Sequence, residues 1–212
     1  MADLTGFIDY RGYAAMQHAA AIDVFRRFIA RVRPKRIVEI GTAQGGFTLA
    51  LRHLLDEAGL SAAVVKSFDI NRCPWFETLE QSNLELITED VFHPAYSSLT
   101  KPELIVPFIR EPGVTVVLCD GGYKIGEFNL LARYIKEGDY ILAHDYIETE
   151  TAFQQDFLGK VWDWHEVREI DIAESCWEHG LEDYQQDEFS NVVWVCKKKL
   201  TTLFELEPAA VL

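Results

Sequence analysis

The chain has 212 residues, of which 49% are hydrophobic and 12% aromatic, and its formal net charge at pH 7 is −14. These values predict one domain with a sizeable core. The acidic excess argues against wrapping DNA or RNA, because neutralising phosphates requires a basic surface. It also argues against docking on anionic lipid. Neither a run of 18 apolar residues nor a basic-then-apolar N-terminus occurs, so no membrane span or signal peptide is expected.

The cysteines are scattered along the chain and form no C-x-x-C pair. They are Cys73, Cys119, Cys176 and Cys196. Two of them stand in apolar, strand-like runs. We therefore expect buried free thiols in a cytoplasmic protein, in preference to a disulfide framework or a zinc site.

Residues 1–34 precede the first predicted strand. A helix is predicted from about Gln17 to Arg31, because one face gathers apolar residues at helical spacing. These residues are Ala21, Val24, Phe25, Phe28 and Ile29. We expect this N-terminal helical segment to cover a face of a sheet, or alternatively to cap a ligand site.

Residues 36–50 predict the start of a βαβ unit: a strand over 37–40, a glycine turn, and a helix to about Glu57. Glycines allow a sharp turn and a close ligand approach, and the helix N-terminus offers unpaired N–H groups. Candidate ligand contacts are Glu39, Gly41, Thr42, Ala43, Gly45, Gly46 and Phe47. A dinucleotide fingerprint would need glycine at position 43, so a pyrophosphate fits poorly. An ordinary βα turn is the alternative.

Further strands are predicted over 62–68, 84–90, 114–120 and 140–143, with helices over 96–110 and 124–136. This alternation is typical of an open, doubly wound parallel α/β sheet. Polar or ligand-facing candidates stand at each strand end. They are Asp69 with Ile70, Asp90 with Val91, Asp120, and His144 with Asp145. Ligands bind at that edge of such sheets, and a carboxylate such as Asp69 can accept both ribose hydroxyls of an adenosine.

The last third of the chain has a different pattern. Residues 161–170 and 191–198 are predicted to form an antiparallel pair of strands. The acidic segment 171–190 between them is either disordered or a lid that contacts substrate. The apolar tail 201–212 packs on the body or on a second subunit, which would make a homo-oligomer.

The form E-x-G-x-x-x-G-G and the ordered series Glu39, Asp69, Asp90, Asp120, His144-Asp145 resemble class I S-adenosylmethionine (SAM)-dependent methyltransferases over about residues 36–146. The resemblance implies a single Rossmann-like domain over 35–200, with a mostly parallel seven-stranded sheet. It also implies SAM as cofactor, with Glu39 near its amino group. Asp90 would then bind the adenine amino group, and Val91 would stack on the ring.

Asp120 and Asp145 end consecutive strands, so their carboxylates can share one divalent cation, with His144 as a third ligand or a base. This arrangement resembles the metal-dependent O-methyltransferases of the catechol type and of the macrocin O-methyltransferase and cephalosporin hydroxylase-related type. These hold Mg²⁺ through an aspartate after strand four and an acidic or acidic-amide pair after strand five. His144-Asp145 departs from that pair, and many metal-free methyltransferases share it. Lys124 follows Asp120 by four residues, as a lysine does in the catechol type.

The sequence therefore predicts a SAM-dependent methyltransferase that acts on an oxygen of a small molecule, with or without Mg²⁺. Lys124 and His144 are the candidates for removing the proton of the acceptor. Two alternatives stay open. One is an NAD(P)-dependent oxidoreductase on a similar sheet, and the other is a non-catalytic SAM-fold protein that binds a partner.

Overall fold

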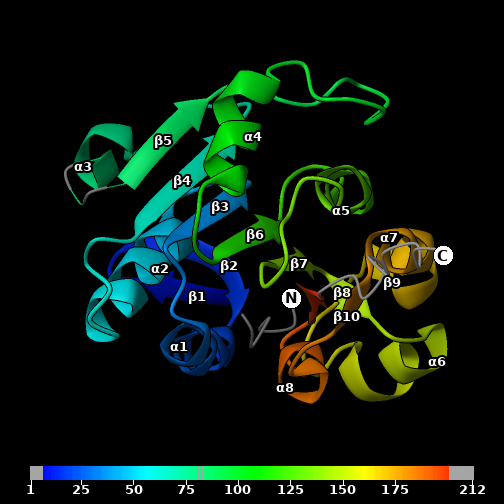
Figure 1. The fold of residues 1–212 in the computed structure, drawn as a ribbon. Coiled ribbons are helices and arrows are strands. Elements are labelled where there is room, and N and C mark those ends of the chain that lie inside the picture. Colours follow the sequence, from blue (N-terminus) through cyan, green and yellow to red (C-terminus); the bar gives the residue numbers. More distant parts are fainter. Residues whose placement is uncertain (1–6, 81, 83, 201–212) are drawn as a thin grey trace, which may run out of the picture.

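The computed structural model describes residues 7–80, 82 and 84–200. At its centre is a seven-stranded sheet with the order β10-β11-β7-β6-β3-β4-β5 (Figure 1). Its parallel strands are β3 (Arg36–Ile40), β4 (Val64–Asp69), β5 (Leu84–Thr88), β6 (Thr115–Cys119) and β7 (Tyr140–His144). Two antiparallel strands, β11 (Trp194–Lys199) and β10 (Leu181–Asp183), extend the β7 edge. The predicted mostly parallel seven-stranded α/β sheet is confirmed.

Every residue of β3, β6 and β7 is buried, because helices cover both faces of the sheet. One face packs on α1 (Ala21–Val32), α2 (Gly46–Glu57) and α8 (Gln186–Ser190). The other packs on α4 (Pro102–Arg110), α5 (Lys124–Leu131) and α7 (Glu169–His179). Smaller elements are α3 (Phe76–Glu80), α6 (Glu150–Ala152) and the π-helix η1 (Phe153–Phe157). The apolar face predicted for α1 is the face that it buries.

Residues 7–18 depart from the predicted helical segment. They form a hairpin of β1 (Phe7–Tyr10) and β2 (Tyr13–His18), and α1 begins only at Ala21. Along β2 the side chains alternate, with Ala15 and Gln17 buried, which is the period of a strand rather than of a helix. The hairpin packs on α2, where the Tyr10 hydroxyl lies 3.1 Å from His53 Nδ1.

Two predicted helices are shorter than expected. The helix expected over 96–110 begins at Pro102, since proline favours the first turn of a helix. Tyr96 lies in a turn before it with a φ of +51°. Pro107 stands inside α4 and does not end it. The helix expected over 124–136 ends at Leu131.

The predicted strand over 161–170 is wrong. Only the two-residue β9 (Val167–Arg168) forms there, and it pairs in parallel with β8 (Tyr146–Ile147). The antiparallel partner of β11 is β10, so the C-terminal antiparallel pair exists with a different first strand.

The acidic segment 171–190 is ordered as most of α7, β10 and α8. Asp171 accepts from the backbone N–H and the guanidinium of Arg168 at the start of α7, and acidic residues stabilise a helix at that end. Gly180 ends α7 in the left-handed conformation. The segment is therefore not disordered. None of its residues lines the two cavities described below, although residues of α7 line a further cavity beside Tyr96, so the contact with substrate stays a prediction.

The predicted apolar tail 201–212 lies outside the described residues. Within residues 7–80, 82 and 84–200, no helix is both long and apolar enough to cross a membrane. The four cysteines are free and buried, as predicted.

Candidate active site

The loop between β3 and α2 lies against the loop that follows β6. A Cβ on Gly41 would meet the backbone oxygen of Asp120 at 2.2 Å, and the φ of Gly41 is +97°. Only glycine fits both conditions. Ala43 takes a positive φ of +46°, and its N–H donates to Asp69 Oδ2 at 2.8 Å. The loop is thus held at the ends of β3, β4 and β6.

The glycine pair that follows in the loop contacts the protein itself. A Cβ on Gly45 would meet Leu79 Cδ1 at 2.2 Å, and one on Gly46 would meet the backbone oxygen of Tyr13 in the hairpin at 2.4 Å. Neither glycine lines either of the two cavities described below. At Gly46 the neighbouring backbone therefore accounts for glycine, and at Gly45 the positive φ of +79° favours glycine as well.

Glu39 points into the interior of the domain. Its Oε2 accepts from Thr48 Oγ1 at 2.6 Å and from Ser67 Oγ at 2.5 Å, and Ser67 also bonds Thr42 Oγ1 at 2.6 Å. Burial raises the pKa of Glu39 to about 7, against the lowering effect of the two hydroxyl donors. Glu39 therefore joins β3, β4 and α2 beneath the loop and lines neither cavity.

The first cavity, here the Asp69 cavity, has a volume of about 380 Å³ and lies at the carboxyl ends of β3, β4, β5 and β6. Asp69 accepts from the N–H groups of Ala43 and Asn71, both at 2.8 Å. Asp90 accepts from the N–H of Phe92 at 3.1 Å. Val91 is buried and Ile70 is exposed, and both line the cavity. Asp69, Ile70, Asp90, Val91 and Asp120, all predicted to bind one ligand, therefore converge on this cavity, and Gly41 and Ala43 line it too. Thr42 and Phe47 line only the second cavity described below, and Glu39, Gly45 and Gly46 line neither.

Several residues of the Asp69 cavity were not predicted from the sequence, Glu127 and Tyr96 among them. Glu127 is buried and accepts from the N–H groups of Gly121 at 3.0 Å and Tyr123 at 3.1 Å. Burial raises the pKa of Glu127 to about 7, although these donors and Lys124 lower it. Tyr96 stacks on Phe92 with ring centroids 5.1 Å apart. A glutamate inside an amphipathic helix and a tyrosine in a turn carry no sequence signal for a site.

The second cavity, here the His144 cavity, has a volume of about 260 Å³. It collects side chains from the hairpin, the glycine loop, the ends of β6 and β7, and the segment after η1. Its lining is Ala14, Ala15, Met16, Gly41, Thr42, Ala43, Phe47, Asp120, Lys124, His144, Asp145, Trp162 and Trp164. Both predicted catalytic residues and the three predicted metal ligands are among them.

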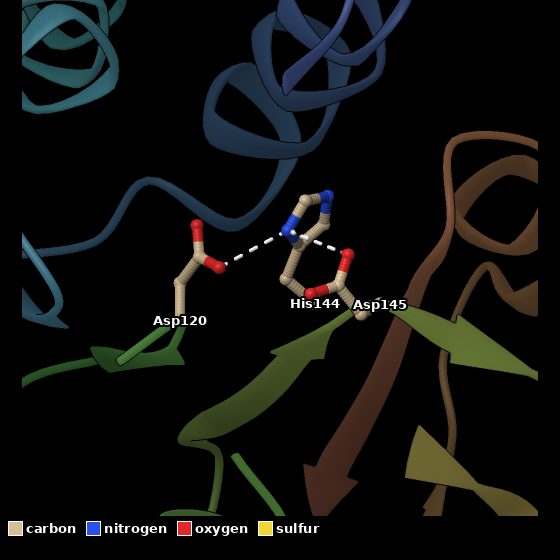
Figure 2. Close-up of side chains that lie close together, drawn as sticks. All are labelled: Asp120, His144 and Asp145. Atoms are coloured by element: carbon tan, nitrogen blue, oxygen red, sulfur yellow. Dashed lines mark hydrogen bonds and ion pairs between the residues drawn. The ribbon is translucent and has the colours of Figure 1, made fainter. Parts of the chain in front are cut away.

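Asp120, His144 and Asp145 form a compact cluster at the ends of β6 and β7 (Figure 2). His144 Nδ1 lies 3.0 Å from Asp120 Oδ1 and 3.5 Å from Asp145 Oδ1. Burial of the His144 ring lowers its pKa, but the two carboxylates outweigh burial and the net pKa lies above its ordinary value. His144 Nε2 is buried and has no hydrogen-bond partner in the described part of the chain. The ring is therefore anchored through Nδ1, whereas Nε2 is buried and unpartnered among the described residues.

Lys124, at the start of α5, places its ammonium among three carboxylates. Nζ lies 3.1 Å from Asp145 Oδ2, 3.2 Å from Glu166 Oε2 and 3.9 Å from Asp120 Oδ1. Burial lowers the pKa of Lys124, but these carboxylates outweigh it and the pKa lies above its ordinary value. Lys124 is thus held as a cation. Glu166 also accepts from the Lys124 N–H at 2.6 Å.

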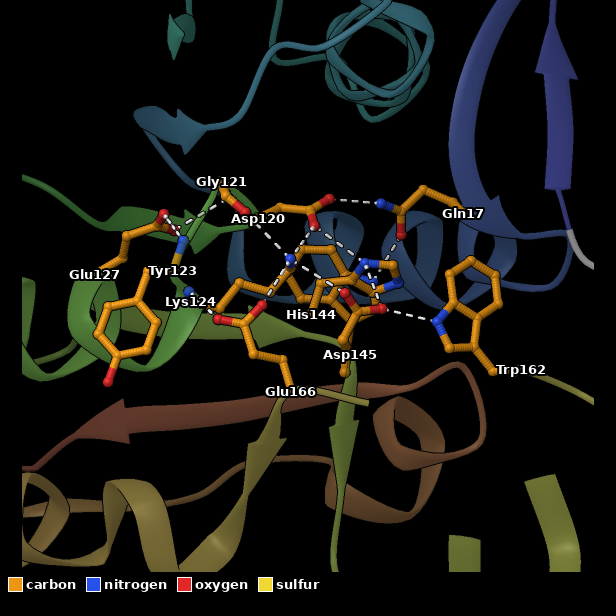
Figure 3. A network of polar contacts seen from close by, with 11 residues as sticks. Gln17, Asp120, Gly121, Tyr123, Lys124, Glu127, His144, Asp145, Trp162 and Glu166 are labelled. Atoms are coloured by element: carbon orange, nitrogen blue, oxygen red, sulfur yellow. Dashed lines mark hydrogen bonds and ion pairs between the residues drawn. The ribbon is translucent and has the colours of Figure 1, made fainter. Parts of the chain in front are cut away.

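The network around the cluster includes residues that the sequence analysis missed (Figure 3). Gln17 Nε2 donates to Asp120 Oδ2 at 2.7 Å, and Trp162 Nε1 donates to Asp145 Oδ1 at 2.7 Å. Asp145 has a positive φ of +56°, and its backbone oxygen accepts from the N–H groups of residues 166 and 167. Backbone strain of this kind concentrates at functional sites.

The two cavities share Gly41, Ala43 and Asp120. They therefore adjoin at the point where the glycine loop meets the end of β6. Ligands of open α/β sheets bind at the carboxyl ends of the strands, and both cavities lie at that edge of this sheet.

The chain matches the FtsJ-like methyltransferase family over residues 10–203. The protein therefore belongs to this family, and the predicted class, a methyltransferase with a Rossmann-like sheet, is confirmed. A comparison with curated proteins finds no match.

Several solved structures share this fold. The structure titled "CmcI-N160 apo-structure" is 17% identical and aligns over 92% of this chain and 76% of its own, with a TM-score of 0.64. "cmcI-D160 Mg-SAM" is 19% identical over 90% and 76%, with a TM-score of 0.63. MycE methyltransferase from the mycinamycin biosynthetic pathway, in complex with Mg, SAH and mycinamycin VI, is 14% identical over 92% and 53%, with a TM-score of 0.51.

Proposed function

We propose that this protein is a SAM-dependent O-methyltransferase whose acceptor is a small molecule. The observation that carries the proposal is the adjoining pair of cavities. One is lined by the strand-end carboxylates, the other holds the Asp120–His144–Asp145 cluster, and Gly41, Ala43 and Asp120 belong to both. A methyl donor in the first cavity would meet an acceptor in the second at this junction.

The residues of the Asp69 cavity suit the adenosine part of SAM. Asp69 offers a carboxylate for the ribose hydroxyls, Asp90 offers one for the adenine amino group, and Val91 offers an apolar contact for the ring. The volume of about 380 Å³ lies in the range of small-molecule sites. SAM, when bound, supplies the methyl group. Titles of structural neighbours name SAM or SAH bound to those proteins, which supports the proposal.

His144 is the residue that we assign to proton removal. Asp120 Oδ1 accepts from Nδ1, so in the neutral ring the lone pair is on Nε2, the nitrogen that has no partner in the described part of the chain. As the acceptor oxygen bonds to the methyl group, the methyl–sulfur bond of SAM would break to leave S-adenosylhomocysteine, and the proton of the acceptor would pass to Nε2. Lys124, the other candidate, lies among three carboxylates that raise its pKa, which favours the ammonium form and makes His144 the better base. Its ammonium instead fixes Asp145.

The donor set also fits a divalent cation. One ligand atom each from Asp120, His144 and Asp145 lies within 4.8 Å of the others, and carboxylate oxygens suit Mg²⁺. When bound there, the ion would lower the pKa of an acceptor hydroxyl. Lys124 already places a positive charge beside the same carboxylates. A titration with Mg²⁺, repeated on Asp120→Ala and Asp145→Ala, tests the site, since loss of one carboxylate should abolish binding.

The alternatives rest on less. An NAD(P)-dependent oxidoreductase would need a pyrophosphate at the loop where Ala43 replaces a glycine, and the family match does not favour it. A non-catalytic SAM-binding protein would share the Asp69 cavity but would have no use for the Asp120–His144 pair. Nucleic acid is the least suitable partner, given the net charge of −14. The four free, buried cysteines support a cytoplasmic location.

Calorimetry with S-adenosylhomocysteine and with NAD is the first experiment. We expect binding of the former and none of the latter, and the reverse result would overturn the proposal. A panel of hydroxyl, amine and thiol acceptors with methyl-labelled SAM then tests the oxygen preference. Binding of SAM with no methyl transfer across the panel would favour the non-catalytic alternative.

A further inference from the structure

Gln17 is a fully buried polar residue on β2, remote in sequence from every strand-end residue of the site. Its amide makes two hydrogen bonds. Nε2 donates to Asp120 Oδ2 at 2.7 Å, and Oε1 accepts from Trp194 Nε1 at 2.8 Å. The proposed function gives it no part, although it reaches the centre of the cluster (Figure 3).

The indole of Trp194 fixes which way the amide points. An indole N–H is a donor only, so the Gln17 oxygen must face it. The Gln17 NH₂ group must then face the carboxylate of Asp120, which in this contact can only accept. A flipped amide would place the Gln17 NH₂ against the indole N–H of Trp194 and the Gln17 oxygen against the carboxylate of Asp120. Trp194 is itself fully buried, so the orientation has no alternative partner in solvent.

The carboxylate of Asp120 is held between Gln17 and His144. With Oδ2 bonded to Gln17, Oδ1 lies 3.0 Å from His144 Nδ1. That nitrogen therefore carries the proton, and the lone pair of the neutral ring is on Nε2. Without the amide, a carboxylate can rotate about its Cβ–Cγ bond and leave the line to His144.

We infer that Gln17 is a positioning residue for methyl transfer: its amide, oriented by Trp194, holds Asp120 against His144 Nδ1 and thereby keeps the lone pair of the neutral His144 ring on Nε2. The inference rests on the proposed function. The hairpin is then part of the catalytic unit and not merely a cover over the sheet.

The first test follows kcat and S-adenosylhomocysteine affinity in Gln17→Met, which keeps the length of the side chain and removes both hydrogen bonds. We expect kcat to fall about 10- to 100-fold, because a misplaced base costs rate, and the dissociation constant to change less than about twofold. Tyr10→Phe is the matched control, since it removes a hydrogen bond that attaches the hairpin to α2. Equal losses in both variants would mean that Gln17 only docks the hairpin, and would overturn the inference.

Trp194→Phe provides a second variant that keeps an aromatic ring in the core. Trp194 also packs on the His144 ring, with centroids 4.8 Å apart, and Trp194→Phe keeps an aromatic ring in that contact. The effect of the substitution should therefore come through Gln17, and the double variant should be no slower than Gln17→Met alone. Additive losses would show that Trp194 acts independently, and the chain of contacts would be refuted.

A spectroscopic test needs no activity. Two-bond proton–nitrogen spectra of ¹⁵N-histidine-labelled, chelator-treated protein distinguish the two neutral tautomers, and His144→Gln identifies the signals of that ring. At a pH where His144 is neutral, we expect the Nδ1–H form in the wild type and a mixture in Gln17→Met. An unchanged tautomer in Gln17→Met, in protein that binds S-adenosylhomocysteine, would reject this inference alone. If the wild-type protein does not bind S-adenosylhomocysteine, the proposed function is rejected instead.

Discussion

The carboxylates of the two cavities are held by different kinds of contact. In the Asp69 cavity, Asp69 and Asp90 accept from backbone N–H groups, all but one of them two residues away in the chain. In the His144 cavity, Asp120 and Asp145 contact side chains from the hairpin, α5 and the segment after η1. Local loop geometry therefore builds the first cavity, whereas packing between distant segments builds the second. Ligand binding and chemistry should accordingly respond to different substitutions.

His144→Gln should show the largest effect. It removes the proton acceptor, so kcat should fall about 10²- to 10⁴-fold while S-adenosylhomocysteine affinity stays close to that of the wild type. In the wild type, kcat should rise with pH through a pKa above the ordinary 6.5 of histidine, because the ring must be neutral and its pKa is raised. Steady-state kinetics from pH 6 to 10 measures both. A kcat independent of pH and of this substitution would remove the proposed base.

Glu39→Gln tests the floor beneath the loop that both cavities share. The folded-state pKa of Glu39 is raised from 4.5 to about 7, so its contribution to stability is complete below pH 4.5 and is lost as pH rises through 7. The loss amounts to about 3 kcal/mol. The variant, which cannot ionise, should lack this part of the fall in unfolding free energy. Urea unfolding at pH 5 and pH 8 measures this. An equal change in unfolding free energy between the two pH values in wild type and variant would contradict the raised pKa of Glu39.

Asp69→Asn should weaken cofactor binding and spare kcat, which is the opposite of the pattern expected for His144→Gln. Losing the charged acceptor should weaken S-adenosylhomocysteine about 10- to 100-fold and leave kcat at saturating SAM nearly unchanged. Glu77→Gln, at an exposed residue outside both cavities, is the control. Calorimetry and kinetics together check the result. A fall in kcat without weaker binding would place Asp69 in the chemical step.

Lys124→Met should have the smallest effect and concerns the His144 cavity alone. Removing the ammonium leaves Asp120 and Asp145 without their nearest cation, so Mg²⁺ should bind about tenfold more tightly. Calorimetric Mg²⁺ titration measures it. Weaker Mg²⁺ binding in the variant would mean that Lys124 helps to shape a metal site rather than competing with it.

The sequence predicts the Asp69 cavity better than it predicts the His144 cavity. Parallel strands that end in Asp69, Asp90 and Asp120 obey local rules, so the sheet and the Asp69 cavity were predictable. Gln17 contacts Asp120, and Glu166 contacts Lys124, only through long-range packing, and no spacing signals either residue. The same holds for Glu39, which has the motif position of a ligand contact and yet bonds Thr48 and Ser67 inside the domain.

The contact beneath the hairpin changes how a glycine motif is to be interpreted. The carbonyl oxygens of Tyr13 and Ala14 occupy the space where a side chain at position 46 would stand. Glycine is therefore needed at position 46 because the backbone of the hairpin packs against it. In related sequences, a bulkier residue at this position would signal that the preceding hairpin is missing or seated elsewhere, whatever the fate of methyl-donor binding. A glycine in an apparent nucleotide-binding motif can thus indicate how the N-terminal hairpin packs on the domain.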